Sequence, residues 1–338
     1  MLGKKTLPII TTALLLLLIL AILVSLAVGA SSIKIGKIIS IIANGYDKNT
    51  SDAQSRIIWQ LRLPRILTSA IAGSILAISG MVYQALFRNP MADPYVLGIS
   101  SGGAFGVAIA LFLGLIGGAT GTWQVPLAAF IGSIGSAILI LLLSNRTKGG
   151  TTTLLLFGVA LNFLLTALMT LFMFLNRSQL QTIFQWTLGS FSTASWSKLK
   201  ILTVVGVVGM VPILLFIREL DIMLTDEQSA YSMGVDVYKV RLILLLFSTL
   251  ITATTVAFCG VIGFIGLMVP HIMRLISGPR HKTLFLLTLI GGALISVCSD
   301  TVARIAVAPS ELPVGIITAI AGSPLFFILV LRHKRRTL

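Results

Sequence analysis

Charged residues are scarce in this sequence. Asp, Glu, Lys and Arg make up 10% of the 338 residues, where an ordinary soluble domain has about 25%. So few charges cannot cover a water-soluble protein of this length, which excludes a cytosolic enzyme and a secreted binding module. Cysteine is also rare: Cys259 and Cys298 lie in apolar runs and provide neither a disulfide framework nor a CxxC metal site. Disorder is excluded because 56% of the residues are hydrophobic.

Long apolar runs are abundant instead, and a helix needs roughly 20 such residues to cross a bilayer. We therefore predict an all-α polytopic membrane protein in which residues 1–338 form one transmembrane domain. The first run, 8–33, exceeds the apolar core of a signal peptide, so we expect a retained helix there. The segment 179–195 is predicted as a short interfacial helix. The ten predicted spans are 9–28, 66–87, 96–114, 124–144, 151–175, 199–217, 242–258, 262–276, 284–302 and 312–331.

The net charge is +15. In a membrane protein, basic residues indicate which loops lie in the cytoplasm, so the positive charge does not predict a nucleic-acid partner. Ten crossings place both termini on one face. Most basic residues fall on that face if it is cytoplasmic, and a basic tail at 332–336 strengthens the assignment. We predict a cell-membrane protein with both termini in the cytoplasm.

Ten of the 25 basic residues lie on the predicted external side, against this rule, and three of them are arginines at the external ends of helices. Arg62 and Arg65 flank Pro64 at the predicted start of the second helix, where the missing proline N–H costs nothing. Arg304 follows Asp300 near the external end of another helix. Snorkelling to the membrane interface would explain all three arginines. The alternative is a basic external patch that recruits an acidic partner.

The polar stretch 218–241 is the longest after the first loop. Its centre fits a capping box, with acidic residues in the first turn and a glycine that ends the helix. A second short amphipathic piece, 235–240, leads into the next span. Such a helix-turn-helix suits a docking surface for a cytoplasmic protein, although an ordinary capped loop helix has the same pattern. The residues assigned to this element are Thr225, Asp226, Glu227, Gln228, Ala230, Met233 and Gly234.

An ion-coupled secondary transporter is one rival interpretation. Such a protein would carry ionisable residues inside its spans. Here Asp93, Asp300 and Glu311 all lie at predicted span ends. The energy for transport is therefore expected from another source.

An intramembrane serine protease is the second rival. Residues 98–102 match the G-x-S-x-G nucleophile motif, and Ser100 or Ser101 could act with His271. That motif requires a strand before it and a helix after it, whereas a membrane helix is predicted here.

Several motifs together resemble the FecCD family of permeases, the membrane subunits of ATP-binding cassette importers for ferric siderophores, haem and vitamin B12. The resemblance implies a type II ABC importer fold with ten helices and cytoplasmic termini. It also implies no catalytic residue, metal or cofactor in this chain, because ATP and Mg²⁺ would bind a partner ATPase. The matching stretches are LRLPRILTSAIAGSILAISGMVYQALFRNPMADPYVLGISSGG (61–103), LLLFGVALN (154–162), QWTLGSF (185–191), DEQSAYSMGV (226–235), GVIGFIGLMVPHIMR (260–274) and SDTVARIAVAPSELPVGIITAIAGSPLFFILV (299–330).

The resemblance also assigns roles to residues. The 226–234 element is similar to the coupling helices that insert into the ATPase subunit. Arg62, Arg65 and Arg304 match positions that receive glutamates from the extracytoplasmic substrate-binding protein. The implied assembly has two permease copies and two ATPase subunits. The translocation path would run between the copies, and the residues assigned to that path and its inner gate are Thr151, Thr152, Asn162, Thr166 and Thr170.

The cargo and the role of the first external loop stay open at this stage. A ferric siderophore is the expected cargo as the commonest class, with vitamin B12, haem or an oxyanion as alternatives. The loop carries Lys34, Lys37 and Lys48, and the sequence does not indicate whether they touch the partner. The fifth predicted helix carries Asn162, Thr166 and Thr170 on one face. Hydrogen bonding between helices explains this polar face as well as a translocation path does.

Overall fold

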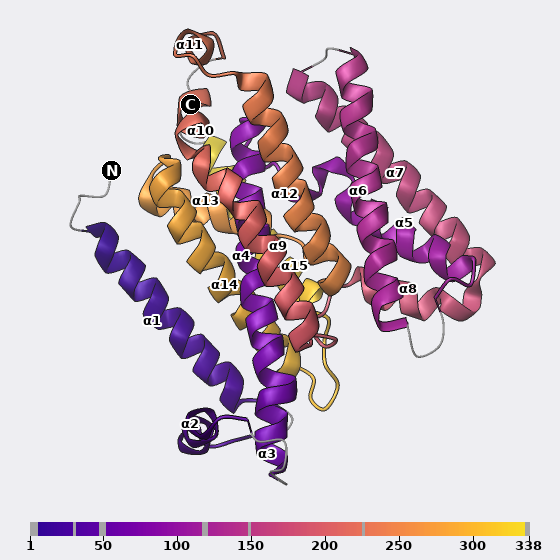
Figure 1. The fold of residues 1–338 in the computed structure, drawn as a ribbon, viewed down its shortest axis with the longest axis vertical. Helices are drawn as coiled ribbons and strands as arrows, with labels where there is room; N and C mark the ends of the chain where they lie inside the picture. The colour runs from indigo at the N-terminus through magenta and orange to yellow at the C-terminus, as the bar shows by residue number, and fades with distance from the viewer. Residues whose placement is uncertain are drawn as a thin grey trace.

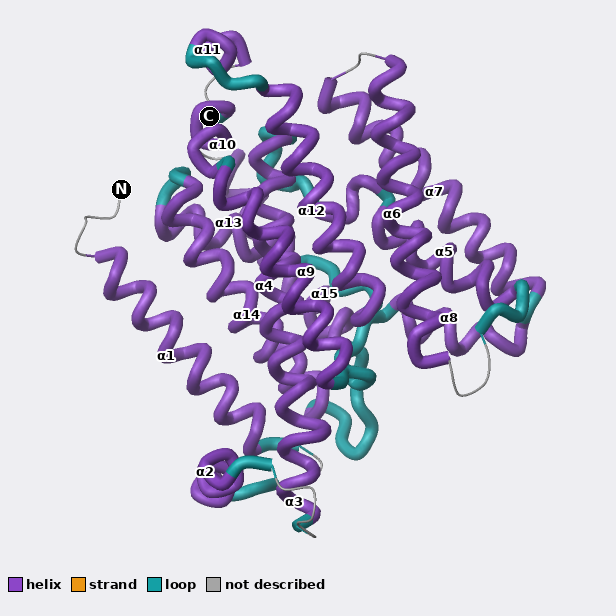
Figure 2. The backbone as a smooth tube through the Cα atoms, in the orientation of Figure 1, coloured by secondary structure: helices purple, strands orange, loops and turns teal. Residues whose placement is uncertain are grey.

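The computed structural model describes residues 6–29, 32–46, 52–116, 121–147, 150–224 and 227–334. Within these ranges the chain is almost entirely helical (Figures 1 and 2). The α-helices are α1 (Thr6–Ala27), α2 (Ile35–Asn44), α3 (Ala53–Arg56), α4 (Leu63–Leu86), α5 (Ile99–Phe112), α6 (Gly121–Thr147), α7 (Gly150–Leu175), α8 (Leu180–Thr187), α9 (Trp196–Leu215), α10 (Ile217–Met223), α11 (Glu227–Ser232), α12 (Val237–Cys259), α13 (Ile265–Ser277), α14 (His281–Ile305) and α15 (Val314–Lys334).

The predicted ten-helix membrane architecture is confirmed, because each predicted span corresponds to a helix. Seven helical stretches of the described chain are long and apolar enough to cross a bilayer. The other three predicted spans are α5, α13 and α15, whose apolar parts are shorter. Helix α1 begins and α15 ends at the end of the bundle that carries α11 (Figure 1).

The two shortest spans begin at loops that touch each other. Before α5, the Tyr95 hydroxyl donates to the carbonyl of Ile262, in the loop that precedes α13, at 3.0 Å. The same hydroxyl accepts from the Ile262 N–H at 3.2 Å. Irregular backbone within a membrane protein needs such internal partners, because lipid offers none. Helices α5 and α13 thus start from one shared junction.

Helix α4 lies in the middle of the bundle and packs against α9, α12, α13 and α14. Two glycine pairs permit this close packing. A Cβ on Gly73 would overlap the backbone of Gly292 in α14, and a Cβ on Gly80 would overlap Gly266 in α13. Small residues allow membrane helices to approach at backbone distance. The group α5–α8 forms the other side of the molecule (Figure 1).

Several predicted boundaries are wrong in detail. The amphipathic piece at 235–240 is not separate, since Val237 already begins α12. The interfacial helix predicted at 179–195 ends at Thr187, because Gly189 turns the chain with φ +68°. Helices α2 and α10 were not predicted from the sequence, because both are short and lie outside the long apolar runs.

Candidate functional site

The two arginines of the R-L-P-R motif lie inside a long helix, which corrects the prediction that they open it. The helix is continuous from Ala53 to Leu86. A π-helical turn, Ile57–Arg62, precedes Pro64, and the N–H of Leu63 bonds to the carbonyl of Ile58. This wider turn accommodates a proline that has no N–H to donate.

Arg65 binds two carboxylates. Its Nε and Nη2 donate to Asp300 of α14 at 2.9–3.1 Å, and its Nη1 donates to Glu311 at 2.7 Å. Asp300 is 1% exposed, whereas Glu311 is 44% exposed, at the rim. A two-point pairing fixes the guanidinium in orientation as well as in position. Arg65 therefore joins α4 to α14 and to the loop after α14.

The other two arginines hold the last turn of α1. Arg62 donates to the carbonyl of Leu26. Arg304 donates through Nη2 to the carbonyl of Ser25 at 2.9 Å and through Nη1 to that of Val28 at 3.4 Å. The final carbonyls of a helix have no partner within the helix, and cations near them are favourable. All three arginines are largely buried, so the free interfacial snorkelling weighed from the sequence does not describe them.

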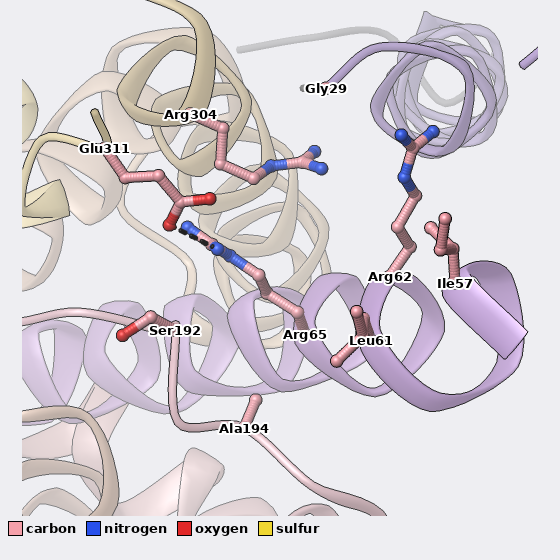
Figure 3. A pocket seen from close by; sticks show the side chains of 9 residues that line it. All are labelled: Gly29, Ile57, Leu61, Arg62, Arg65, Ser192, Ala194, Arg304 and Glu311. Carbon is pink, nitrogen blue, oxygen red and sulfur yellow. Dashed lines mark hydrogen bonds and ion pairs between the residues drawn. The ribbon is translucent and has the colours of Figure 1, made fainter. Parts of the chain in front are cut away.

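The three guanidinium groups line one pocket of about 370 Å³ (Figure 3). Figure 3 shows the three side chains around one space, Arg62 and Arg65 from the helix 53–86 and Arg304 from α14, with Glu311 beside Arg65 and Gly29 near Arg304. Two carboxylates, Asp300 and Glu311, face three arginines, so a positive charge remains for an anionic group from outside. The residues that line the pocket are Gly29, Ile57, Leu61, Arg62, Arg65, Ser192, Ala194, Arg304 and Glu311.

The sequence did not identify Glu311 or the end of α1 as parts of this site. The signal that was available is the spacing of Asp300 and Arg304, which places them on one helix face. The structure pairs them at 3.4 Å. No sequence pattern pointed to Ser25 or Leu26, because they contribute backbone carbonyls that any residue carries.

The predicted coupling element forms α11, which stands at the opposite end of the bundle from the arginine pocket (Figure 1). Ala230 is buried, whereas Tyr231 and Met233 are 57% and 68% exposed. Gly234 has φ +81°, in agreement with the predicted helix end. Thr225 and Asp226 lie outside the described residues, as do the side chains of Glu227 and Gln228.

Helix α10 connects the base of α11 to two central helices. Beyond the end of α4, Arg88 donates to the carbonyl of Met223 at 2.9 Å. At the start of α14, the ring of His281 lies 2.7 Å from a carboxylate oxygen of Asp221. Helices α4 and α14 carry the pocket arginines near their other ends. The same two helices therefore carry the arginine pocket near one end and contact α10, the neighbour of α11, at the other.

The residues predicted for a path do not share one environment. Asn162 of α7 accepts a 2.6 Å hydrogen bond from Ser101 of α5, which is the interhelical role weighed from the sequence. Thr152, Thr166 and Thr170 are exposed on this single chain, and the Thr170 hydroxyl bonds to the Thr166 carbonyl. The side chain of Thr151 lies outside the described part.

The protease interpretation is not supported by the geometry. The segment before Gly98 is a 3₁₀ turn, Pro94–Leu97, and not a strand. The hydroxyl of Ser101 bonds to Asn162 and to the carbonyl of Gly98, where a catalytic serine would bond to a histidine.

Comparison with known proteins gives a consistent result. The sequence model of the FecCD transport family matches residues 17–332. The hemin transport system permease protein HmuU of Yersinia pestis is 36% identical over 320 residues, covering 94% of this chain and 95% of that protein. The molybdate import system permease protein MolB of Haemophilus influenzae is 34% identical over 332 residues, covering 97% of each. The cobalamin import system permease protein BtuC of Halobacterium salinarum is 39% identical over 284 residues, covering 82% and 74%.

A solved structure agrees with these relatives. An inward-facing conformation of a metal-chelate type ABC transporter superposes with a TM-score of 0.84 at 32% identity, covering 96% of this chain and 99% of that one. Sequence, fold and family motifs thus point the same way. The chain belongs to the FecCD transport family and is a multi-pass permease subunit of an ABC importer.

Proposed function

We propose that this chain is one of two identical permease subunits of an importer that takes up an iron chelate delivered by an extracytoplasmic substrate-binding protein. The arginine pocket receives carboxylates of that binding protein. Helix α11 docks on a separate ATPase subunit, which binds the ATP and Mg²⁺. The permease itself is expected to catalyse no reaction.

The observation that carries this proposal is that Arg62, Arg65 and Arg304 line one pocket, at the end of the bundle opposite α11. Arginine matches carboxylates with two parallel N–H donors, and the surrounding structure already fixes each of the three groups. Complementary charge mainly sets the register and the rate of association. Those properties suit a partner that docks and leaves in every cycle.

The docking test uses variants that do not leave a buried carboxylate facing a second anion. A single Arg65→Glu change would leave Asp300 facing a second anion, so Arg65→Gln is combined with Asp300→Asn. This double variant and Arg62→Gln should each weaken binding of the importer's own binding protein to the permease in nanodiscs at low salt. Lys200→Gln is the matched control, because Lys200 is an exposed cation at the start of α9, outside the pocket. Unchanged affinity in both pocket variants would overturn the docking assignment.

The ATPase contact is supported by the exposed side chains of α11. Tyr231 lies in this short helix and Met233 in the turn that follows it, and both are exposed next to buried Ala230. Met233→Asp should abolish binding-protein-stimulated ATP hydrolysis in the reconstituted complex. Lys282→Ser, an exposed change at the same end of the bundle, is expected to leave it intact. Equal stimulation in both variants would contradict the assignment of α11.

The second copy is proposed to cover α7. Only 17% of the apolar part of this helix is buried within one chain, and Phe163 is 73% exposed. A path between two copies would place Thr166 and Thr170 at its wall. Thr170→Cys should therefore form a disulfide-linked dimer on mild oxidation in membranes. A matched change on α1, Leu16→Cys, should not cross-link.

The iron chelate is proposed as the cargo, with cobalamin, haem and an oxyanion as alternatives. The relatives are named for hemin, cobalamin and molybdate, so the family accepts cargoes of very different size. Competition binding of a ferric siderophore, haemin, cobalamin and molybdate to the purified binding protein would decide among them. Preference for any of the last three would replace the iron chelate and leave the importer assignment intact.

A further inference from the structure

Helix α2 has three different flanks. Ile38 and Ile41 are buried against the chain, where they join a cluster with Leu26 and Ile58. At about 100° of rotation per residue, the exposed isoleucines of α2 share a second flank. They are 52%, 57% and 39% exposed at Ile35, Ile39 and Ile42, in that order. The third flank, on the other side of the buried one, carries Lys37, Ser40 and Asn44.

Three isoleucines exposed along one flank of a helix would be unfavourable in water. The pattern of protein on one flank, apolar stripe on the next and polar groups beyond is that of a helix lying in a membrane interface. In Figure 1, α2 is seen end on while α1 and α4 run along the page. Its axis therefore crosses the bundle axis, as an interfacial helix requires.

The residues around α2 also indicate a position at the membrane interface. Helix α1, which contacts α2, leaves Leu16 and Leu20 62% and 56% exposed, as a lipid-facing helix does. Tyr46, just past the end of α2, lies 6.3 Å from the ring of Trp59, and Trp59 lies 6.4 Å from Trp196. Tyr and Trp gather at membrane–water interfaces because their rings are apolar and their tips are polar. The aromatic cluster thus lies beside α2 where the headgroup region is expected.

We propose that α2 is an interfacial helix whose isoleucine stripe, Ile35, Ile39 and Ile42, lies among the lipids of the outer leaflet, with Lys34 beside their phosphates. Lys34 is exposed at the start of the helix, and an ammonium group there complements a phosphate. Assignment to the outer leaflet rests on the proposed function, in which the arginine pocket faces outward. The contact with lipid does not depend on it.

This contact would position the arginine pocket. Lys37 Nζ pairs with Asp52 at 3.2 Å, and Asp52 caps α3 by accepting from the N–H of Gln54. The ring N–H of Trp59 donates to the Ile41 carbonyl at 3.4 Å. Asp52 and Trp59 belong to the start of the helix that carries Arg62. A helix fixed in the leaflet therefore holds the entrance of the pocket at a defined height.

The test compares spin labels on two flanks of α2. Ile39→Cys labels the stripe, and Ser40→Cys labels the polar flank one residue away. Both are made in a Cys298→Ala background, because Cys298 is the exposed cysteine of the described chain and Cys259 is buried. The full-length permease is reconstituted in liposomes of phosphatidylethanolamine and phosphatidylglycerol. Collisions with oxygen, which dissolves in lipid, and with a water-soluble nickel chelate are measured by power saturation.

We expect the label at position 39 to show a several-fold higher ratio of oxygen to nickel collisions than the label at position 40. Equal, nickel-accessible labels would overturn the proposal, because the stripe would then lie in water. Protection at position 39 that appears only after binding protein is added would also overturn it and assign the stripe to that protein. Dipolar coupling between labels at position 39 would assign it to a second copy and overturn it as well. Failure of the docking test leaves this measurement unaffected.

Discussion

Arg65 and Asp300 form a two-point ion pair between α4 and α14, and the carboxylate of that pair is almost completely buried. Asp300 also lies 3.4 Å from Arg304. One carboxylate therefore fixes two of the three arginines that line the pocket. The pocket depends on this acidic residue as much as on its basic ones.

Asp300→Ala should be strongly destabilising. It removes the buried anion and leaves two largely buried guanidinium groups without their shared partner, a change that costs about 3–5 kcal/mol when a buried pair is broken. Thermal unfolding of the purified permease in detergent measures the loss. The double variant Arg65→Gln with Asp300→Asn should recover the part of the loss that comes from Arg65, whose charge is then gone as well, while Arg304 still lacks its carboxylate. A single variant as stable as the parent would show that the pair is not structural.

Glu311→Gln should strengthen docking. Glu311 occupies Nη1 of Arg65 from an exposed rim position, so it competes with any incoming carboxylate. An exposed ion pair contributes up to about 1 kcal/mol, which corresponds to about fivefold in affinity. The affinity of the importer's binding protein for the permease in nanodiscs tests this. Weaker docking would contradict this prediction and would show that Glu311 orients Arg65 for the incoming carboxylate.

Gly80→Ala should destabilise the helix packing. The added Cβ would overlap the backbone of Gly266, which cannot turn aside as a flexible side chain could. Overpacking of this kind costs about 1–3 kcal/mol. Gly135→Ala in α6 is the matched control, because a Cβ there meets nothing within 4 Å. Equal melting temperatures for the two variants would refute the close contact.

Asp93→Asn should reduce the dependence of stability on pH. Burial raises the pKa of Asp93 to about 6. The folded chain then binds more protons than the unfolded chain between the ordinary carboxyl pKa and about 6, so stability falls as pH rises through that window. Asparagine keeps a side-chain oxygen that can accept from the Tyr95 N–H, as Asp93 does. Melting temperatures of both proteins at pH 4, 5 and 6 should differ least at the acidic end. Parallel curves would contradict this.

The ten predicted spans were predictable because an apolar run long enough to cross a bilayer has few alternative structures. Helix α2 was not predicted, because its ten residues are too few for a span. Its five isoleucines are divided between a buried and an exposed flank, and only the folded chain shows which isoleucine belongs to which flank. The π-helical turn before Pro64 was also missed, since proline close to an apolar run usually marks a helix start.

The site was only partly predictable for a different reason. The positive-inside rule left ten basic residues on the external side, and the family motifs singled out Arg62, Arg65 and Arg304 among them. The structure brings these three together. Their internal partners come from positions far along the chain, with Ser25 and Leu26 on one side and Glu311 on the other. Contacts through backbone carbonyls leave no trace in residue type. The sequence could therefore identify the cations but not what already binds them.

The glycine contact between Gly73 and Gly292 has a thermodynamic consequence for the proposed importer. It joins α4 and α14 along their length, while α10 holds one end of both and Arg65 with Asp300 joins them near the other. We expect a pair of helices fastened in this way to move as one unit. The free energy by which nucleotide in the ATPase changes affinity at the arginine pocket must then equal the free energy by which docking changes affinity for nucleotide. Docking and nucleotide binding would be two readouts of a single coupling energy.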